Sequence, residues 1–141
     1  MDWSEPRTTV LVGRKHSGKT NALRYIIHLN TIKQKRYKFG VVFTNTKFDD
    51  EYTFMPEGYI IQGWDVDVFN EYLDQLLKAK EDSKDEKIPC NFIIFDDLVS
   101  VLTDSSEFNN FICNHRHYNT HVFLCAQYLK RGVTTTLREY S

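Results

Sequence analysis

The chain has 141 residues, 41% hydrophobic and 26% charged, a composition that suits one globular domain spanning residues 1–141. Its net charge of −1 does not mark a nucleic-acid binder, so any such binding needs a local patch. No apolar run approaches transmembrane length, and the stretch MDWSEPRTT lacks the pattern of a signal peptide. Three cysteines without paired spacing fit a reduced, intracellular setting best.

Short apolar segments alternate with segments of helical periodicity along the chain. Strands are expected at residues 8–13, 39–44, 91–95 and 121–126, with a short extended piece at 59–62. Helices are expected at residues 18–32, 66–80 and 105–115, the last with Ser105 or Ser106 as its N-cap. This alternation predicts an α/β fold, with a mostly parallel sheet flanked by helices and joined by right-handed crossovers.

A phosphate-binding motif, G-x-x-x-x-G-K-[ST], lies between the first expected strand and the first expected helix. The predicted nucleotide-binding residues are Gly13, Ser17, Gly18, Lys19, Thr20 and Asn21. Glycines let backbone N–H groups turn toward phosphate oxygens, and the helix N-terminus adds a positive dipole end. Lys19 is expected to reach the β- and γ-phosphates of ATP, and the Thr20 hydroxyl to bind Mg²⁺. The alternative is a chance glycine turn, against which the motif and both flanking elements agree.

Two acidic residues end the apolar stretch FIIFDD. Asp96 is expected to hold Mg²⁺ directly or through water, because its strand brings the carboxylate close to the phosphate loop. Asp97 is the candidate catalytic acid that orients or deprotonates the attacking water. The structural alternative for Asp97 is a cap on the next turn. Aspartate is also shorter than the more usual glutamate, so the water would be held differently.

Other nucleotide-binding classes fit less well. The stretch TNTKFD resembles a guanine-reading motif, but it precedes Asp96, whereas GTPases place it afterwards. Val99 also stands where the GTPase motif D-x-x-G requires glycine. A small-molecule kinase needs an arginine-rich lid, and the arginines after the third strand form no compact pattern. A kinase therefore stays open only as a second alternative.

The strand expected at 121–126 is followed by a polar residue, Gln127. In the P-loop class that inserts a strand between the phosphate-loop strand and the acidic strand, a polar side chain here senses the γ-phosphate or the attacking water. The amide of Gln127 can do this, although an ordinary strand-end glutamine explains it as well.

The stretches GRKHSGKTNAL, FIIFDDL, FNNFICNHRHYNTHVFLCAQYLK and TLRE together resemble the genome-packaging ATPases of large DNA viruses. These are the poxvirus-type members of the FtsK–HerA superfamily, and the resemblance spans nearly the whole chain. It implies a ring-forming, Mg²⁺-dependent ATPase that pumps double-stranded DNA into a capsid. A viral protein of this kind would act in the host cytoplasm or at the virus assembly site, with capsid or packaging proteins as further partners.

The resemblance also assigns roles to individual residues. Lys19 and Thr20 would bind phosphates and Mg²⁺, Asp96 would be the Mg²⁺ carboxylate, Asp97 the catalytic acid and Gln127 the sensor. Arg116 would either reach the nucleotide of a neighbouring subunit or pair with an acid of its own subunit. Arg138 resembles an arginine that follows the sensor strand.

One departure from the family pattern concerns the end of the chain. Family members continue with a further strand, whereas only YLKRGVTTTLREYS follows Gln127 here. We therefore expect a domain that stops after the fourth core strand, with an apolar strand at the sheet edge unless a partner or the tail covers it. This motivates an alternative function, a nucleotide-binding but hydrolysis-poor module that regulates or assembles with a longer partner.

Two weaker patterns have simpler explanations. The basic cluster KQKRYK is explained by its place at a helix C-terminus, where the helix dipole favours cations. The functional alternative is contact with DNA phosphates. Cys113, His115, His117 and His121 match no standard zinc spacing, and Cys125 is expected in the core.

Taken with the motifs above, the favoured interpretation is an ATP-hydrolysing motor domain for packaging double-stranded viral DNA.

Overall fold

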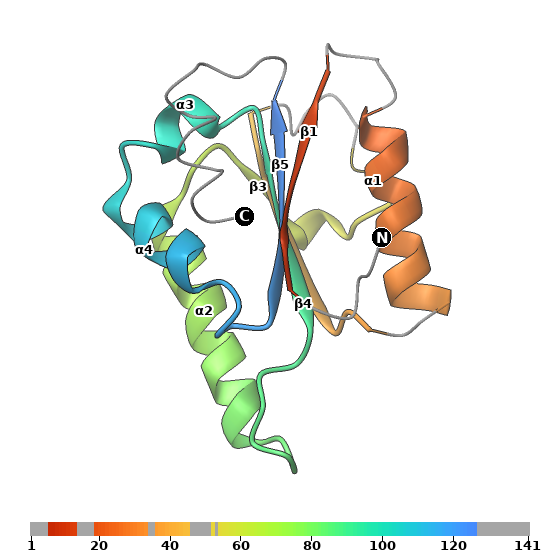
Figure 1. The fold of residues 1–141 in the computed structure, drawn as a ribbon, viewed down its shortest axis with the longest axis vertical. Helices are drawn as coiled ribbons and strands as arrows, with labels where there is room; N and C mark the ends of the chain where they lie inside the picture. Colours follow the sequence, from red (N-terminus) through yellow and green to blue (C-terminus); the bar gives the residue numbers. More distant parts are fainter. Residues whose placement is uncertain (1–5, 14–18, 34–35, 46–51, 53, 127–141) are drawn as a thin grey trace.

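A five-stranded, all-parallel sheet forms the centre of the molecule (Figure 1). It is seen in a computed structural model that describes residues 6–13, 19–33, 36–45, 52 and 54–126. The strands are β1 (Thr8–Val12), β2 (Phe39–Thr44), β3 (Ile60–Gln62), β4 (Asn91–Asp96) and β5 (Thr120–Ala126). Their spatial order is β1-β5-β4-β2-β3, so the last strand in the chain lies between the first strand and β4. The prediction of a parallel α/β sheet is confirmed.

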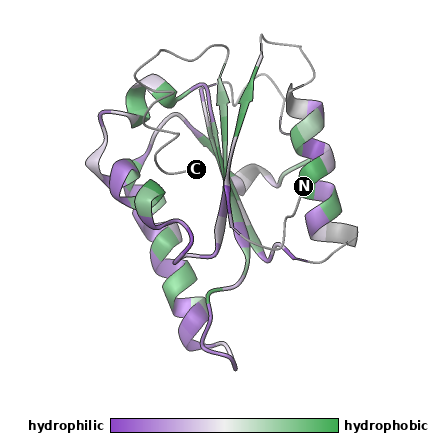
Figure 2. Ribbon diagram, in the orientation of Figure 1, coloured by the Kyte–Doolittle hydropathy of each residue, from purple (hydrophilic) through white to green (hydrophobic). Residues whose placement is uncertain are grey.

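Helices cover both faces of this sheet (Figure 1). On one face lies α1 (Lys19–His28), which continues into a π-helical turn, η1 (Leu29–Lys33). The short 3-10 helix η3 (Glu57–Tyr59) lies on the same face. On the other face lie α2 (Val66–Glu81), α3 (Val99–Leu102) and α4 (Ser106–Asn114). The strands are the most apolar part of the ribbon and the outer helix faces the most polar, as Figure 2 shows. This pattern is typical of a sheet buried on both faces.

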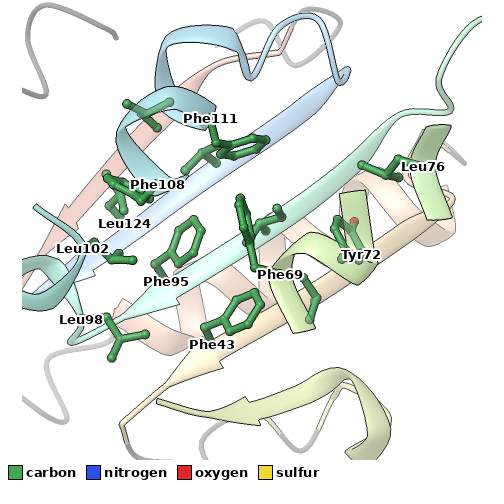
Figure 3. Close-up of a cluster of buried hydrophobic side chains, with 14 of the residues drawn as sticks. Phe43, Phe69, Tyr72, Leu76, Phe95, Leu98, Leu102, Phe108, Phe111 and Leu124 are labelled. Carbon is green, nitrogen blue, oxygen red and sulfur yellow. The ribbon is translucent and has the colours of Figure 1, made fainter. Parts of the chain in front are cut away.

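Alternate residues of the strands supply two separate cores. Toward α2, α3 and α4, strand residues such as Phe43 and Phe95 pack with Phe69, Phe108 and other apolar side chains (Figure 3). The Phe43 and Phe95 rings stack with centroids 5.7 Å apart. The second core lies on the α1 face, and its strand members are Val42, Ile60, Phe92, Ile94, Phe123 and Cys125. Cys125 is therefore a core residue, as expected.

Side-chain caps set where two helices begin. The Asp65 carboxylate accepts hydrogen bonds from the backbone N–H groups of Asp67 and Val68 at the start of α2. Ser105 is the N-cap of α4, because its hydroxyl accepts from the N–H of Phe108 at 3.2 Å. These bonds satisfy donors that the first helical turn leaves open. The choice between Ser105 and Ser106 is thereby settled in favour of Ser105.

Three features of the fold differ from the sequence expectation. The extended piece at 59–62 is a full strand over Ile60–Gln62, so the sheet has five strands among the described residues instead of four. The first α-helix ends at His28 and widens into the π-helical turn, where the buried Asn30 carbonyl accepts from the N–H groups of Arg36 and Tyr37. The short helix α3 was not expected, because four residues are too few to show a helical period.

Two buried histidines lie near the amino end of β5. The Tyr37 hydroxyl lies 2.9 Å from Nδ1 of His121, and Nδ1 of His115 lies 3.0 Å from the carbonyl oxygen of Thr120. Burial lowers the pKa of His121 to about 4, with Arg7, His115 and Arg36 as further contributors. Burial also lowers the pKa of His115, partly opposed by its bond to Thr120. Both imidazoles are therefore neutral near pH 7.

We predict that folding stability falls as the pH drops below about 6.5. The unfolded chain binds a proton at each histidine from about this pH downward, while folded His121 does so only near 4. Between pH 7 and pH 5, His121 alone should lower the free energy of unfolding by about 2 kcal/mol. Urea denaturation at several pH values measures this.

The matched pair His121→Gln and His117→Gln provides the control for this measurement. Glutamine at 121 can still hydrogen-bond to Tyr37 but does not titrate, so the pH dependence should shrink. His117 is exposed, and its replacement should leave the dependence intact. An equal pH dependence in both variants would contradict the assignment to His121.

Candidate functional site at the carboxyl ends of the strands

The carboxyl ends of all five strands meet at one edge of the sheet, because every pairing is parallel. Ligands of open α/β sheets bind beyond this edge. Gly13 follows β1 and Asp97 follows β4, with β5 between them. The Gly13 N–H donates to the carbonyl of Ala126 at 3.0 Å, and the Asp97 N–H donates to that of Cys125 at 2.8 Å. The two halves of the predicted nucleotide site are thus tied to the same strand.

Asp96 is a buried carboxylate at this edge. It is the last residue of β4 and only 2% exposed. Its Oδ2 accepts a hydrogen bond of 3.2 Å from the hydroxyl of Thr44, its register partner on β2. Strand alternation places Asp96 on the same face as Phe92 and Ile94, the face that α1 covers. The carboxylate therefore lies on the side of the sheet from which the phosphate-loop helix starts.

Asp97 has an exposed side chain and an unusual backbone. Its φ is 57°, in the left-handed region that non-glycine residues seldom adopt. The Asn45 amide donates to the Asp97 carbonyl at 2.7 Å, and the Gln62 amide donates to the Asn45 carbonyl at 3.1 Å. This chain of bonds links the ends of β3, β2 and β4, and it holds the strained residue in place.

The structural alternative for Asp97, a helix cap, is not observed. The N-cap position of α3 is Leu98, and no side chain caps this helix. The Asp97 side chain is exposed at the strand edge. A carboxylate in this position can accept a proton from a water molecule beside a bound phosphate.

The phosphate loop is described only at its two ends. Gly13 closes β1, and α1 begins at Lys19, which makes Lys19 and Thr20 the first two helical residues. The first turn of α1 contains no acidic residue, so its positive dipole end is not neutralised from within the helix. Asn21 is exposed in the same turn. Ser17, Gly18 and the side chains of Lys19 and Thr20 lie outside the described part of the chain.

The oxygen groups at this edge fit a magnesium ion chemically. Mg²⁺ is bound through one or two carboxylates together with phosphate oxygens and water. Asp96 supplies such a carboxylate, and the Thr44 hydroxyl orients it. The described residues contain no group of three or more histidine, cysteine or acidic side chains that could hold a metal alone. The Asp96 carboxylate itself suits an ion that phosphate oxygens also hold.

Arg116 is not brought to this edge. It lies exposed in the turn after α4, before the amino end of β5. The seven residues of β5 separate this turn from Asp97, a distance of roughly 20 Å at the rise of a strand. Within one subunit, Arg116 and Asp97 thus belong to opposite ends of the sheet. Gln127 and Arg138 lie outside the described residues.

Polar groups at the amino end of the sheet satisfy one another. Asn91 accepts from the hydroxyls of Tyr72 and Thr120, and its amide donates to nearby carbonyls. His115 and His121, considered as zinc candidates, belong to this buried region and bond to Thr120 and Tyr37. These buried groups at the amino end are therefore structural, whereas the carboxyl end presents the exposed side chains of Asp97 and Asn21.

Sequence reasoning missed three residues of the site. Thr44, Asn45 and Gln62 each orient a group at the strand edge. The signal was present, because each follows or ends a short apolar strand, in FGVVFTN and YIIQG. The same signal had singled out Asp96 and Gln127.

The five-stranded parallel sheet with helices on both faces is an α/β fold of the P-loop type. A family profile described as Poxvirus A32 protein matches residues 3–139, and the chain belongs to this family. This confirms the resemblance to poxvirus-type ATPases. No curated protein sequence gives a significant match. No helix in the described ranges is long and apolar enough to cross a membrane.

Solved structures that share the fold include two ATPase-related proteins. One is the cytoplasmic domain of the Type VII secretion ATPase EccC of Thermomonospora curvata, at 17% identity and a TM-score of 0.61. The other is the pCW3 conjugation coupling protein TcpA in monomer form with ATPγS, at 16% identity and a TM-score of 0.65. The matches cover 94% and 99% of this chain, but only 19% of EccC and 48% of TcpA. This chain thus corresponds to less than half of either protein.

The left-handed backbone of Asp97 leads to a stability prediction. Asp97→Gly should be more stable than Asp97→Ala by about 1 kcal/mol, because only glycine adopts a positive φ without steric cost. Both variants lack the carboxylate, so the comparison isolates the backbone. Urea denaturation measures the difference.

Asp74 is the matched control for this pair, since it is exposed within α2. There the order should reverse, with Asp74→Gly less stable than Asp74→Ala by about 1 kcal/mol. The same order at both positions would show that Asp97 does not have a strained backbone.

Proposed function

We propose that the protein is an ATP-hydrolysing motor domain that packages double-stranded viral DNA into capsids. The observation that carries this proposal is the pair Asp96–Asp97 at the end of β4, one strand away from the end of β1. Membership of the Poxvirus A32 protein family supports it. The proposed partners are double-stranded DNA, further copies of the chain in a ring, and capsid or packaging proteins. The proposed location is the host cytoplasm or the virus assembly site.

The proposed chemistry is phosphoryl transfer to water by positioning and charge neutralisation. The nucleotide would be held by Gly13 and by Ser17–Asn21 at the start of α1. Thr20 and Asp96 would hold Mg²⁺, which when bound neutralises charge on the phosphate oxygens. Thr44 keeps the Asp96 carboxylate oriented. Asp97 would accept the proton of the attacking water, while Asn45 keeps its backbone in place.

Two sensors complete the proposal. Gln127 would follow β5 directly at the site, between the ends of β1 and β4. Arg116, at the opposite end of β5, would act on the nucleotide of a neighbouring subunit, because within its own subunit it lies far from Asp97. An arginine supplied by another molecule can stabilise the charge of a phosphoryl-transfer transition state.

We predict ATP hydrolysis that rises when double-stranded DNA is added. Lys19→Ala and Asp97→Asn should each reduce turnover by about 100-fold or more, since each removes a group that acts on the reacting phosphate or water. Release of inorganic phosphate measures this, and Lys84→Ala, an exposed change between α2 and β4, is the control. Wild-type turnover equal to that of Asp97→Asn, with ATP still bound, would favour the hydrolysis-poor module. Phosphate transferred to a small acceptor would favour a kinase.

The role of Arg116 leads to a mixing prediction. Arg116→Ala subunits keep their own nucleotide site, and Asp97→Asn subunits keep Arg116. If Arg116 acts between subunits, each variant should be inactive alone, and a mixture of the two should regain part of the activity. A mixture no more active than its components would contradict an intersubunit role.

A further inference from the structure

A pocket of ≈ 790 Å³ lies on the α1 face of the sheet. It runs along α1 from Asn21 to the turn at Thr31 and reaches the amino end of β2 at Lys38 and Phe39. Of the described residues assigned to ATP binding, Asn21 alone lines this pocket, which extends from there along α1 toward the amino end of β2. The pocket therefore adjoins the proposed ATP site at Asn21, and its size is that of a small-molecule site.

The floor of the pocket is a fixed aromatic surface. A Cβ atom at Gly40 would lie 2.1 Å from Cζ of Phe92, so the Phe92 ring rests directly on the backbone of β2. The Tyr37 ring lies 5.0 Å from that of Phe92, and its hydroxyl is bound to His121. Both rings are nearly buried. Glycine at position 40 is thus what allows a flat, apolar floor at this place.

The rim of the pocket is aromatic and exposed. Tyr25, Phe39 and Tyr59 line it and are 65%, 41% and 55% exposed. Half of the large apolar side chains that are exposed in the described residues therefore gather around this one pocket. Aromatic faces held open to solvent in this way are suited to stack on another flat ring.

The charge of the rim is positive. The cations Arg24 and Lys38 line the pocket, and none of the described residues that line it is acidic. The Arg24 guanidinium lies 5.6 Å from the centre of the Phe54 ring on the opposite wall. The aromatic rim would complement a flat apolar part of a ligand, and the cations would complement a negatively charged group on it.

We propose that this pocket binds a nucleotide unit, with its base on the exposed aromatic rings and its phosphate beside Arg24 and Lys38. The unit can come from a free mononucleotide or from single-stranded DNA, which offers the same base and phosphate in a chain. The proposal does not depend on hydrolysis at the phosphate loop. Under this proposal, Lys38 of the basic cluster KQKRYK contacts a phosphate group of the ligand.

The test is titration calorimetry with unlabelled AMP and, separately, with an unlabelled thymidine decamer. The protein carries Lys19→Ala, so that the phosphate loop does not contribute. Tyr25→Ala and Tyr59→Ala should each weaken binding by about 5- to 100-fold, the range found when one stacked base loses its aromatic partner. Lys38→Ala should weaken binding of the decamer and reduce its salt dependence.

Matched controls lie on the other side of the sheet. Leu77→Ala removes another exposed apolar side chain, and Lys84→Ala removes another exposed cation, so both should leave binding unchanged. Binding of AMP would identify a free nucleotide as the source, and binding of the decamer alone would identify single-stranded DNA. Failure of both ligands to bind, or binding that the tyrosine variants do not weaken, would overturn the proposal. ATP hydrolysis by Tyr59→Ala in the otherwise wild-type chain should be normal in either case, which separates this test from that of the motor.

Discussion

The parallel register of β1, β5 and β4 is the constraint on which the site depends. Because all three strands run the same way, their carboxyl ends meet, and β5 sets the spacing between Gly13 and Asp97. Both residues donate backbone hydrogen bonds to β5. A shift of β5 by one residue would turn its apolar side chains to the wrong faces and would separate the two bonds. The two cores on either side of the sheet therefore also hold the two halves of the site in register.

The two ends of the sheet have different physical characters. At the amino end, Tyr72 and Thr120 both donate to Asn91 and His121 is buried and neutral, so the polar groups there contribute to stability. At the carboxyl end, a buried carboxylate and a strained, exposed aspartate lie together. Such a concentration of strain and charge lowers stability, and it is retained where function requires it. The bonds from Asn45 and Gln62 are what keep Asp97 in this conformation.

Much of the fold could be predicted from the sequence because its strands are short, apolar and bounded by clear helical periods. The bounds of β2 were predicted to the residue, and those of β4 and β5 to within one. Strand β3 was underestimated, since three residues carry little pattern and its pairing with β2 is a tertiary contact. The helix α3 has only four residues and was missed for a similar reason.

The acidic residues of the candidate site could be predicted from the sequence, but their hydrogen-bond partners could not. Asp96 and Asp97 follow an apolar strand, a pattern visible along the chain. Their partners Thr44 and Asn45 are 52 residues away in sequence, and only the strand order brings them together. The left-handed conformation of Asp97 arises from these tertiary bonds as well. The position of Arg116 far from Asp97 likewise follows from the direction of β5, which its sequence neighbourhood does not reveal.

The central claim is that Asp96 holds a magnesium ion beside the phosphates of bound ATP. The most direct measurement is the affinity for ATP with and without Mg²⁺, determined by calorimetry for the wild-type chain and for Asp96→Asn. The account predicts that Mg²⁺ strengthens ATP binding to the wild-type chain and that this gain disappears in Asp96→Asn. An equal gain from Mg²⁺ in both proteins would contradict it.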